Sequence, residues 1–232
     1  FGRLFAILGP PFPKHSGGPV QMGRLIAKEM KEVVGPEGRV CGVDTSPQMI
    51  AMAQGLCPGG EFALGSATDL PFEDGVFDAV TAAQLFCFVH EPDRAVEEMY
   101  RVVKPGGRVV ILDTDWESLI WNCRNQDLMK RAIAMLTGPY ADPSVPRTLS
   151  RRLRNAGFTV TKRRSFAVLN WEMDPETYAQ QTAGFIKSMM AASNEFTEGD
   201  WVEWEADQRG TDEAGEFMFS LNRFIFSAEK EV

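Results

Sequence analysis

The sequence predicts an α/β protein, built on a mostly parallel sheet with helices on both faces and an antiparallel pair of strands at one edge. Three observations predict this class. Short apolar runs alternate with amphipathic helical segments in the central part of the chain, as in parallel sheets covered on both faces. Two later runs, separated by helical segments, have the pattern of added antiparallel strands. No apolar run reaches the roughly 18 residues that span a bilayer.

The first part of the alternating region contains two strands around a helix. The run Gly38–Asp44 (GRVCGVD) is largely apolar and ends in an acid. The segment Ser46–Gln54 opens with an N-cap serine and a proline at the first helical position, which is a strong helix start. The run EFALGSA at residues 61–67 is then typical of a second strand.

The next part repeats this arrangement. Phe77–Gln84 has the pattern of a strand, and Asp93–Val103 has the pattern of an amphipathic helix. The sequence KPGG at Lys104–Gly107 ends that helix, and Arg108–Trp116 is an almost wholly apolar strand. The residues that share the apolar helical face are Ala95, Val96, Met99, Val102 and Val103.

Right-handed crossovers place the carboxyl ends of parallel strands on one edge of the sheet, where such folds bind ligands. We therefore expect a ligand site at this edge. The residues predicted to lie there are Asp44, Gly65 to Ala67, Ala82 to Gln84, and Asp113 to Trp116.

Beyond Trp116 the chain is predicted to form further helices and two strands that add to the sheet's edge as an antiparallel pair. The chain has no linker, internal repeat or low-complexity segment, so we expect one domain over residues 1–232. Helices within residues 117–215 are candidates for a lid over a hydrophobic substrate. The alternative is that their methionine and tryptophan side chains are simply core.

Composition restricts the partners. The net charge of −8 argues against a nucleic-acid backbone as main partner, since phosphates require a positive footprint. The segment Arg151–Arg164 carries six basic residues, and we interpret it as a solvated helix face followed by an exposed strand end. We expect a small-molecule substrate and no membrane partner, while a homodimer stays open. The four cysteines have no metal-ligand or redox spacing, which favours reduced thiols in a cytoplasmic protein and no metal site.

The segments GRVCGVDTSPQMIAMAQ, GSATDLPFEDGVFDAV and AVEEMYRVVKPGGRVVILDTDW resemble, in this order and spacing, class I S-adenosylmethionine-dependent methyltransferases. The nearest group is the small-molecule branch that includes ubiquinone-type C-methyltransferases. The resemblance covers residues 20–116 well. It implies a Rossmann-like methyltransferase fold with a seven-stranded sheet, in which the first strand is absent or altered, and S-adenosylmethionine as cofactor.

The resemblance also assigns cofactor contacts. Asp44, with Thr45 beside it, would hold the ribose hydroxyls, a role that a carboxylate after this strand performs in nucleotide-binding folds. The alternative is that Asp44 caps the following helix, for which Ser46 is better placed. Ser66 and Ala67 would lie along the adenine, although many members have an aspartate at the position of Ser66. The residues that would face the methyl-sulfonium group are Ala82, Ala83 and Gln84.

The N-terminal segment departs from the family pattern of an acid followed by a glycine-rich loop. Gly17 and Gly18 precede a good helix and are the expected loop residues, but no acid occurs before Glu29. Proline cannot donate to a central strand, so GPPFPK is not the first strand; Arg3–Pro11 is the other candidate. Three explanations are open: an altered or missing segment over residues 1–20, a changed cofactor loop, or loss of methyl transfer with retention of the fold.

Candidate catalytic residues are Asp113, Asp115 and His90. An acid after the fifth strand is able to orient or deprotonate a substrate hydroxyl or amine, although one of the two aspartates is expected to cap the next helix. His90 is more often structural at such a position. Trp116 and Trp121 are expected either to wall an apolar substrate pocket or to lie in the core.

The function that the sequence predicts is methyl transfer from S-adenosylmethionine to a small apolar molecule at O, N or C. Two alternatives follow from the irregular N-terminal segment. One is a fold relative that catalyses a cyclisation or rearrangement instead, and the other is a non-catalytic binding subunit.

Overall fold

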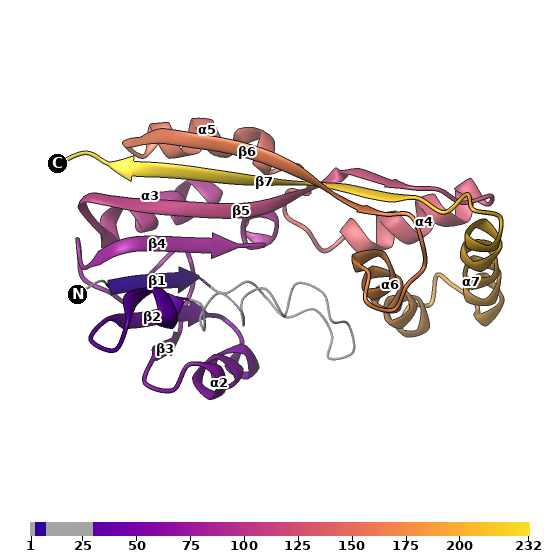
Figure 1. The fold of residues 1–232 in the computed structure, drawn as a ribbon, viewed down its shortest axis with the longest axis horizontal. Coiled ribbons are helices and arrows are strands. Elements are labelled where there is room, and N and C mark those ends of the chain that lie inside the picture. The colour runs from indigo at the N-terminus through magenta and orange to yellow at the C-terminus, as the bar shows by residue number, and fades with distance from the viewer. Residues whose placement is uncertain (1–2, 8–29) are drawn as a thin grey trace.

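The computed structural model describes residues 3–7 and 30–232. It contains a seven-stranded sheet of order β3-β2-β1-β4-β5-β7-β6 (Figure 1). Its strands are β1 (Arg3–Ile7), β2 (Arg39–Asp44), β3 (Glu61–Leu64), β4 (Phe77–Ala83), β5 (Val103–Trp121), β6 (Phe158–Asn170) and β7 (Phe219–Lys230). Its helices are α2 (Pro47–Leu56), η1 (Phe86–Phe88), α3 (Pro92–Val102), α4 (Gln126–Thr137), α5 (Pro146–Asn155), α6 (Tyr178–Ala192) and α7 (Glu198–Glu213).

Strands β1 to β5 pair in parallel, whereas β7 is antiparallel to both β5 and β6. This arrangement confirms the predicted mostly parallel sheet with an antiparallel edge pair. The order reverses between β1 and β4, because β2 and β3 lie on one side of β1 and the later strands on the other. Such a reversal is where open α/β sheets bind ligands.

The first strand is present, and it occupies the more N-terminal of the two candidate positions. Strand β1 covers Arg3–Ile7 and pairs with β2 on one side and β4 on the other. It therefore ends before the prolines at positions 10, 11 and 13, which are unable to donate to a sheet ladder. The backbone pairing at the centre of the sheet is thus retained.

Strand β5 is longer than predicted, and the expected end at Trp116 is wrong. It begins at Val103, directly after α3, and continues to Trp121. The antiparallel partner β7 pairs with it from Arg108 to Asp115 and again, after a register shift, at Ile120 and Trp121. Pairing with a strand distant in the sequence therefore extends β5 beyond the apolar run.

The packing of α3 follows its sequence pattern. Val96, Met99 and Val102 are fully buried on one face of the helix, and α3 packs against β5 and α5. Each such side chain stabilises the fold by roughly 1.5–3 kcal/mol through removal from water. Gly106 has a φ of 75°, a left-handed conformation that favours glycine, in the KPGG segment that follows the helix.

Helices α4, α6 and α7 pack on one another and gather at one end of the molecule, beside the far ends of β5, β6 and β7 (Figure 1). They fall within the predicted lid region, and the lid role itself stays a prediction. Over residues 3–7 and 30–232, none of the helices has the length and hydropathy that crossing a bilayer requires.

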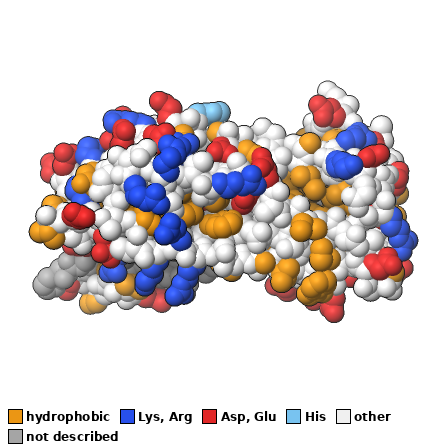
Figure 2. Space-filling model, turned by 90° about the horizontal axis from the view of Figure 1, so that it is seen from above, with side chains coloured by type: hydrophobic (Ala, Val, Ile, Leu, Met, Phe, Trp, Pro, Cys, Tyr) orange, Lys and Arg blue, Asp and Glu red, His pale blue; other side chains and the backbone are white. Residues whose placement is uncertain are grey.

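Most basic side chains of the segment Arg151–Arg164 are exposed, as predicted. Arg151 and Arg154 are exposed on α5, and Lys162 to Arg164 are exposed on β6. Figure 2 shows basic side chains gathered over this half of the surface, with hydrophobic side chains more frequent toward the other end. All four cysteines are buried. The cytoplasmic location stays a prediction.

Candidate functional site

A pocket of about 390 Å³ lies at the carboxyl ends of β2 and β3, at the edge that topology predicts. It contains four of the predicted cofactor residues and His90, in contact with apolar side chains from the segment after β4. The residues that line it are Val43, Asp44, Thr45, Gly65, Ser66, Ala67, Thr68, Leu85, Phe88, Val89, His90 and Glu91.

Asp44 is the last residue of β2 and is 3% exposed. Its Oδ1 accepts a hydrogen bond from the Ser46 backbone N–H at 2.7 Å, while its Oδ2 has no hydrogen-bond partner among the described residues. Ser46 caps α2, since its side chain accepts from the Met49 N–H, so Asp44 is not the cap. Burial raises the pKa of Asp44 to about 6, against the lowering effect of the Ser46 and Thr45 backbone N–H groups.

Ser66 and Ala67 line the same pocket from the loop after β3. The Ser66 hydroxyl forms a 2.7 Å hydrogen bond with Thr68 Oγ1 and accepts one from the Thr68 backbone N–H. The loop therefore has a defined turn in place of the carboxylate that many family members carry here. A hydroxyl still has further hydrogen-bonding capacity for a ligand.

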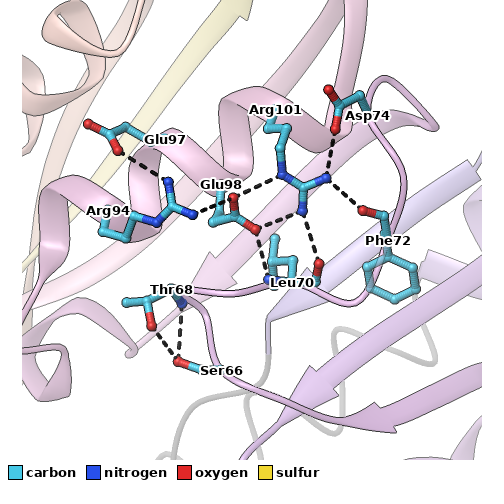
Figure 3. Close-up of polar contacts among 9 residues, drawn as sticks. All are labelled: Ser66, Thr68, Leu70, Phe72, Asp74, Arg94, Glu97, Glu98 and Arg101. Carbon is cyan, nitrogen blue, oxygen red and sulfur yellow. Dashed lines mark hydrogen bonds and ion pairs between the residues drawn. The ribbon is translucent and has the colours of Figure 1, made fainter.

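A buried ion pair fixes this loop to α3 (Figure 3). Glu98 is 2% exposed, accepts from the Leu70 backbone N–H at 2.8 Å and pairs with Arg101 at 2.7 Å. Arg101 in turn donates to the carbonyls of Leu70 and Phe72 and pairs with Asp74 at 2.8 Å. These bonds join α3 to the chain that follows Ser66 and Ala67.

Sequence reasoning missed the role of Glu98 and Arg101. The available signal was an acid beside the apolar face of the helix at 93–103, where a charge needs a partner. The pKa of Glu98 is lowered, chiefly by its hydrogen bond from Arg101, which keeps the carboxylate ionised.

At the end of β4, Ala82, Ala83 and Gln84 are all buried. Gln84 has a φ of 52°, which is costly for a residue with a side chain and is frequent at functional sites. Its side-chain amide donates to Thr114 Oγ1 on β5, and its Oε1 has no partner within the described part of the chain.

Asp113 is fully buried in β5. Its Oδ2 accepts from the Phe86 backbone N–H at 2.7 Å, and its Oδ1 accepts from the Thr114 N–H at 2.9 Å. Burial raises the pKa of Asp113 to about 6, against the lowering effect of these N–H groups. Its observed contacts fix the segment that follows Gln84.

Asp115 is buried as well, and Arg147 of α5 donates to both its oxygens at 2.8 and 2.9 Å. The expectation that one of these aspartates caps the next helix is wrong. Asn125 caps α4 by accepting from the Leu128 N–H at 3.0 Å, because β5 continues past both aspartates.

The two tryptophans are buried rather than exposed at the pocket. Trp116 packs on Tyr140, with 5.2 Å between ring centroids, and Trp121 packs on Trp204 at 5.5 Å. Neither lines the pocket described above. Their predicted substrate role is untested.

The loop glycines Gly17 and Gly18 lie outside the described residues, so their predicted cofactor role cannot be placed on the structure. Across the part of the chain that is described, no cluster of three or more His, Cys, Asp or Glu side chains is arranged to hold a metal ion.

Comparisons with known proteins agree with this geometry. Residues 22–111 match a family described as a methyltransferase domain. The demethylmenaquinone methyltransferase of Lactococcus lactis subsp. lactis is 39% identical over 98 residues, which are 39% of this chain and 38% of that protein. The chain thus spans less than two-fifths of the length of this curated relative.

Solved structures show the same fold over the whole chain. A putative methyltransferase from Bacillus halodurans superposes with a TM-score of 0.64 at 15% identity, covering 100% of this chain and 93% of that one. The cyclase SpnF superposes with a TM-score of 0.56 at 20% identity, covering 100% and 76%. At these identities the likeness concerns the fold alone.

Proposed function

We propose that this chain, whose residues 22–111 match a methyltransferase domain, is a class I S-adenosylmethionine-dependent methyltransferase that transfers a methyl group to a small, largely apolar molecule. The observation that carries this proposal is the buried carboxylate of Asp44, with one oxygen unpartnered in the described chain, beside a pocket at the carboxyl edge of the sheet.

The residues present fit the cofactor. An unpartnered carboxylate oxygen is costly to bury and is satisfied by a vicinal hydroxyl of a ribose. Ser66 and Ala67 would then lie along the adenine, and the end of β4 at Ala82 to Gln84 would lie near the sulfonium. When bound, the cofactor supplies a methyl group on a positively charged sulfur, which makes that group electrophilic.

The chain's own residues would contribute to catalysis by positioning the acceptor and the cofactor. Methyl transfer requires an acceptor atom in line with the sulfonium, so holding both molecules in register supplies most of the acceleration. We assign Asp113 and Asp115 to positioning, because their oxygens are engaged by backbone N–H groups and by Arg147. His90 is the predicted catalytic side chain that lines the pocket, and we retain it as a candidate proton acceptor.

The relative from Lactococcus lactis is named for its action on demethylmenaquinone. We extend this only to the class of acceptor, an aromatic or otherwise apolar small molecule, since the matched segment is less than half of either protein. The homodimer left open by the sequence stays untested.

A second candidate is a protein of this fold that no longer methylates. The cyclase SpnF has the same fold, so fold alone does not decide between methyl transfer and a rearrangement. The irregular segment before residue 22, which the family match does not include, keeps this candidate open.

Calorimetric titration with S-adenosylmethionine and S-adenosylhomocysteine tests the proposal. We expect micromolar binding that weakens about 10- to 100-fold in Asp44→Ala, since hydrogen bonds to a charged group contribute roughly 1.5–3 kcal/mol. Glu97→Ala, exposed on α3 and outside the lining of this pocket, is the matched control. Absence of binding up to millimolar ligand would refute methyl transfer by this chain, and binding without turnover to S-adenosylhomocysteine would favour the second candidate.

A further inference from the structure

A group of buried hydrogen-bond donors lies beyond the cofactor pocket, and neither the fold nor the proposed function accounts for it. We call it the donor cluster: Arg223 of β7, Tyr178 of α6, Tyr140 and Trp116. Arg223 is 6% exposed, and its Nε and Nη2 atoms have no hydrogen-bond partner in the described structure. The hydroxyls of Tyr140 and Tyr178 and the indole nitrogen of Trp116 are likewise buried, and within the described residues the polar neighbours are the Arg223 guanidinium for Tyr178 and the Cys87 thiol for Trp116.

The members of the donor cluster are neighbours. The Arg223 guanidinium lies over the Tyr178 ring, 4.5 Å from its centroid, and Tyr140 stacks on Trp116. Burial raises the pKa of Tyr140, and electrostatic interactions with Cys87, Tyr178 and Asp113 raise it further. Phe88, which lines the cofactor pocket, packs edge-on against Tyr140 at 4.9 Å.

A polar row connects this cluster to the predicted methyl-transfer point. Gln84 at the end of β4 donates to Thr114 on β5, and Thr114 is the cross-strand partner of Arg223 on β7. Neighbouring strands are about 4.8 Å apart, so Arg223 lies roughly 10 Å across the sheet from the end of β4.

The donor cluster contains more hydrogen-bond donors than acceptors. Arginine and the tryptophan indole donate only, and each tyrosine hydroxyl carries a proton to donate. Asp113, which interacts electrostatically with Tyr140, has both oxygens engaged by backbone N–H groups, and the Oε1 of Gln84 is neutral. A buried cation without a counter-charge is expensive, so an acceptor from outside the described residues would stabilise this site.

We propose that the donor cluster binds an anionic group of the methyl acceptor, a carboxylate in its simplest form, about 10 Å from the methyl-transfer point. The inference rests on the proposed function and makes it more specific. The acceptor then has an apolar body, an acceptor atom at one end and an acidic group at the other. Arg223 is the residue that selects for the acid.

The experiment uses the full chain saturated with S-adenosylhomocysteine, whose own titration reports separately on the cofactor pocket. Two probes of the same shape are compared by calorimetry: 6-hydroxy-2-naphthoate, with a carboxylate opposite its hydroxyl, and 2-naphthol, without one. We expect the carboxylate probe to bind roughly tenfold or more tightly than 2-naphthol, because charge-assisted hydrogen bonds are the strong ones.

Arg223→Met should abolish this preference while leaving affinity for S-adenosylhomocysteine unchanged. Arg163→Met, which removes a cation exposed on β6, is the matched control and should keep the preference. Tyr178→Phe retains the ring and removes one donor, so we expect a smaller, few-fold loss for the carboxylate probe alone.

The melting temperature of the ligand-free protein distinguishes a binding role from a structural one. Removal of an unpaired buried cation in Arg223→Met should leave this temperature unchanged or raise it. A fall on the order of 5 °C or more would overturn the proposal, as would equal affinity for the two probes, binding of neither, or a preference that survives in Arg223→Met. If S-adenosylhomocysteine itself fails to bind, the proposed function fails first, and the same probes on the ligand-free chain still test Arg223.

Discussion

The raised pKa of Asp44 makes cofactor affinity depend on pH in a way that identifies this carboxylate. Burial raises the pKa to about 6, and if Asp44 holds the ribose hydroxyls as proposed, its ionised form is the stronger acceptor. Between pH 7.5 and pH 5.0 the ionised fraction falls from nearly all to about a tenth. We therefore expect the Kd for S-adenosylhomocysteine to increase about tenfold over this range, equivalent to roughly 1.4 kcal/mol.

Calorimetry at pH 7.5, 6.0 and 5.0 measures this change. His90 also lines the pocket, so the assay needs variants that separate the two side chains. Asp44→Asn keeps the shape without a charge and should bind weakly, with little dependence on pH. His90→Gln should retain the tenfold change.

The pH dependence of folding stability gives an independent check, because it runs in the opposite direction to the pH dependence of cofactor affinity. A carboxyl whose pKa is raised in the folded state binds protons more tightly there than in the unfolded chain. Its stabilising contribution is therefore complete below about pH 4 and is lost as the pH rises through about 6. The ligand-free protein should gain stability from Asp44 at the pH where the cofactor loses affinity. A wild-type Kd that stays constant from pH 7.5 to 5.0, or an Asp44→Asn variant that follows the wild type, would refute the reasoning.

Three further predictions concern the scaffold of the site. Glu98→Gln should lower the free energy of unfolding, measured by urea titration, by about 2–3 kcal/mol because it weakens a buried ion pair. The control Glu97→Gln, at an exposed position of the same helix, should change it by less than about 0.5 kcal/mol. The pKa of Asp113 is raised, as that of Asp44 is, so the wild-type protein should lose stability between pH 4 and pH 7. In Asp113→Asn this loss in the free energy of unfolding should be smaller than in the wild type by up to about 3 kcal/mol. Gln84→Gly should relieve about 1 kcal/mol of backbone strain but also removes the buried hydrogen bond to Thr114, so we expect a melting temperature close to that of the wild type and a loss of substrate turnover.

The sequence predicted the sheet because its central segments carry local signals. Asp44 ends an apolar run directly before an N-cap serine and a proline, so the strand, the acid and the helix start all follow from neighbouring residues. The amphipathic pattern of α3 and its stop at KPGG are local in the same way.

What the sequence could not predict depends on distant pairing. Strand β5 continues to Trp121 because β7, about a hundred residues later, pairs with it, and this moves Asp113 and Asp115 from a strand end into a buried strand. The pairing of Asp115 with Arg147 likewise joins two segments whose proximity no local pattern encodes.

The boundary of the family match separates the two halves of the site. All of the described cofactor candidates, from Asp44 to Gln84, lie within the matched residues 22–111, whereas every member of the donor cluster lies beyond them. On the proposed function, the matched segment would hold the cofactor. Arg223 and Tyr178 lie outside the match. The register of β7 on β5 places Arg223 opposite Thr114, and Tyr178 of α6 packs against its guanidinium. If both proposals hold, specificity for the acceptor depends on this later part of the chain, and affinity for the cofactor depends on the edge that carries Asp44.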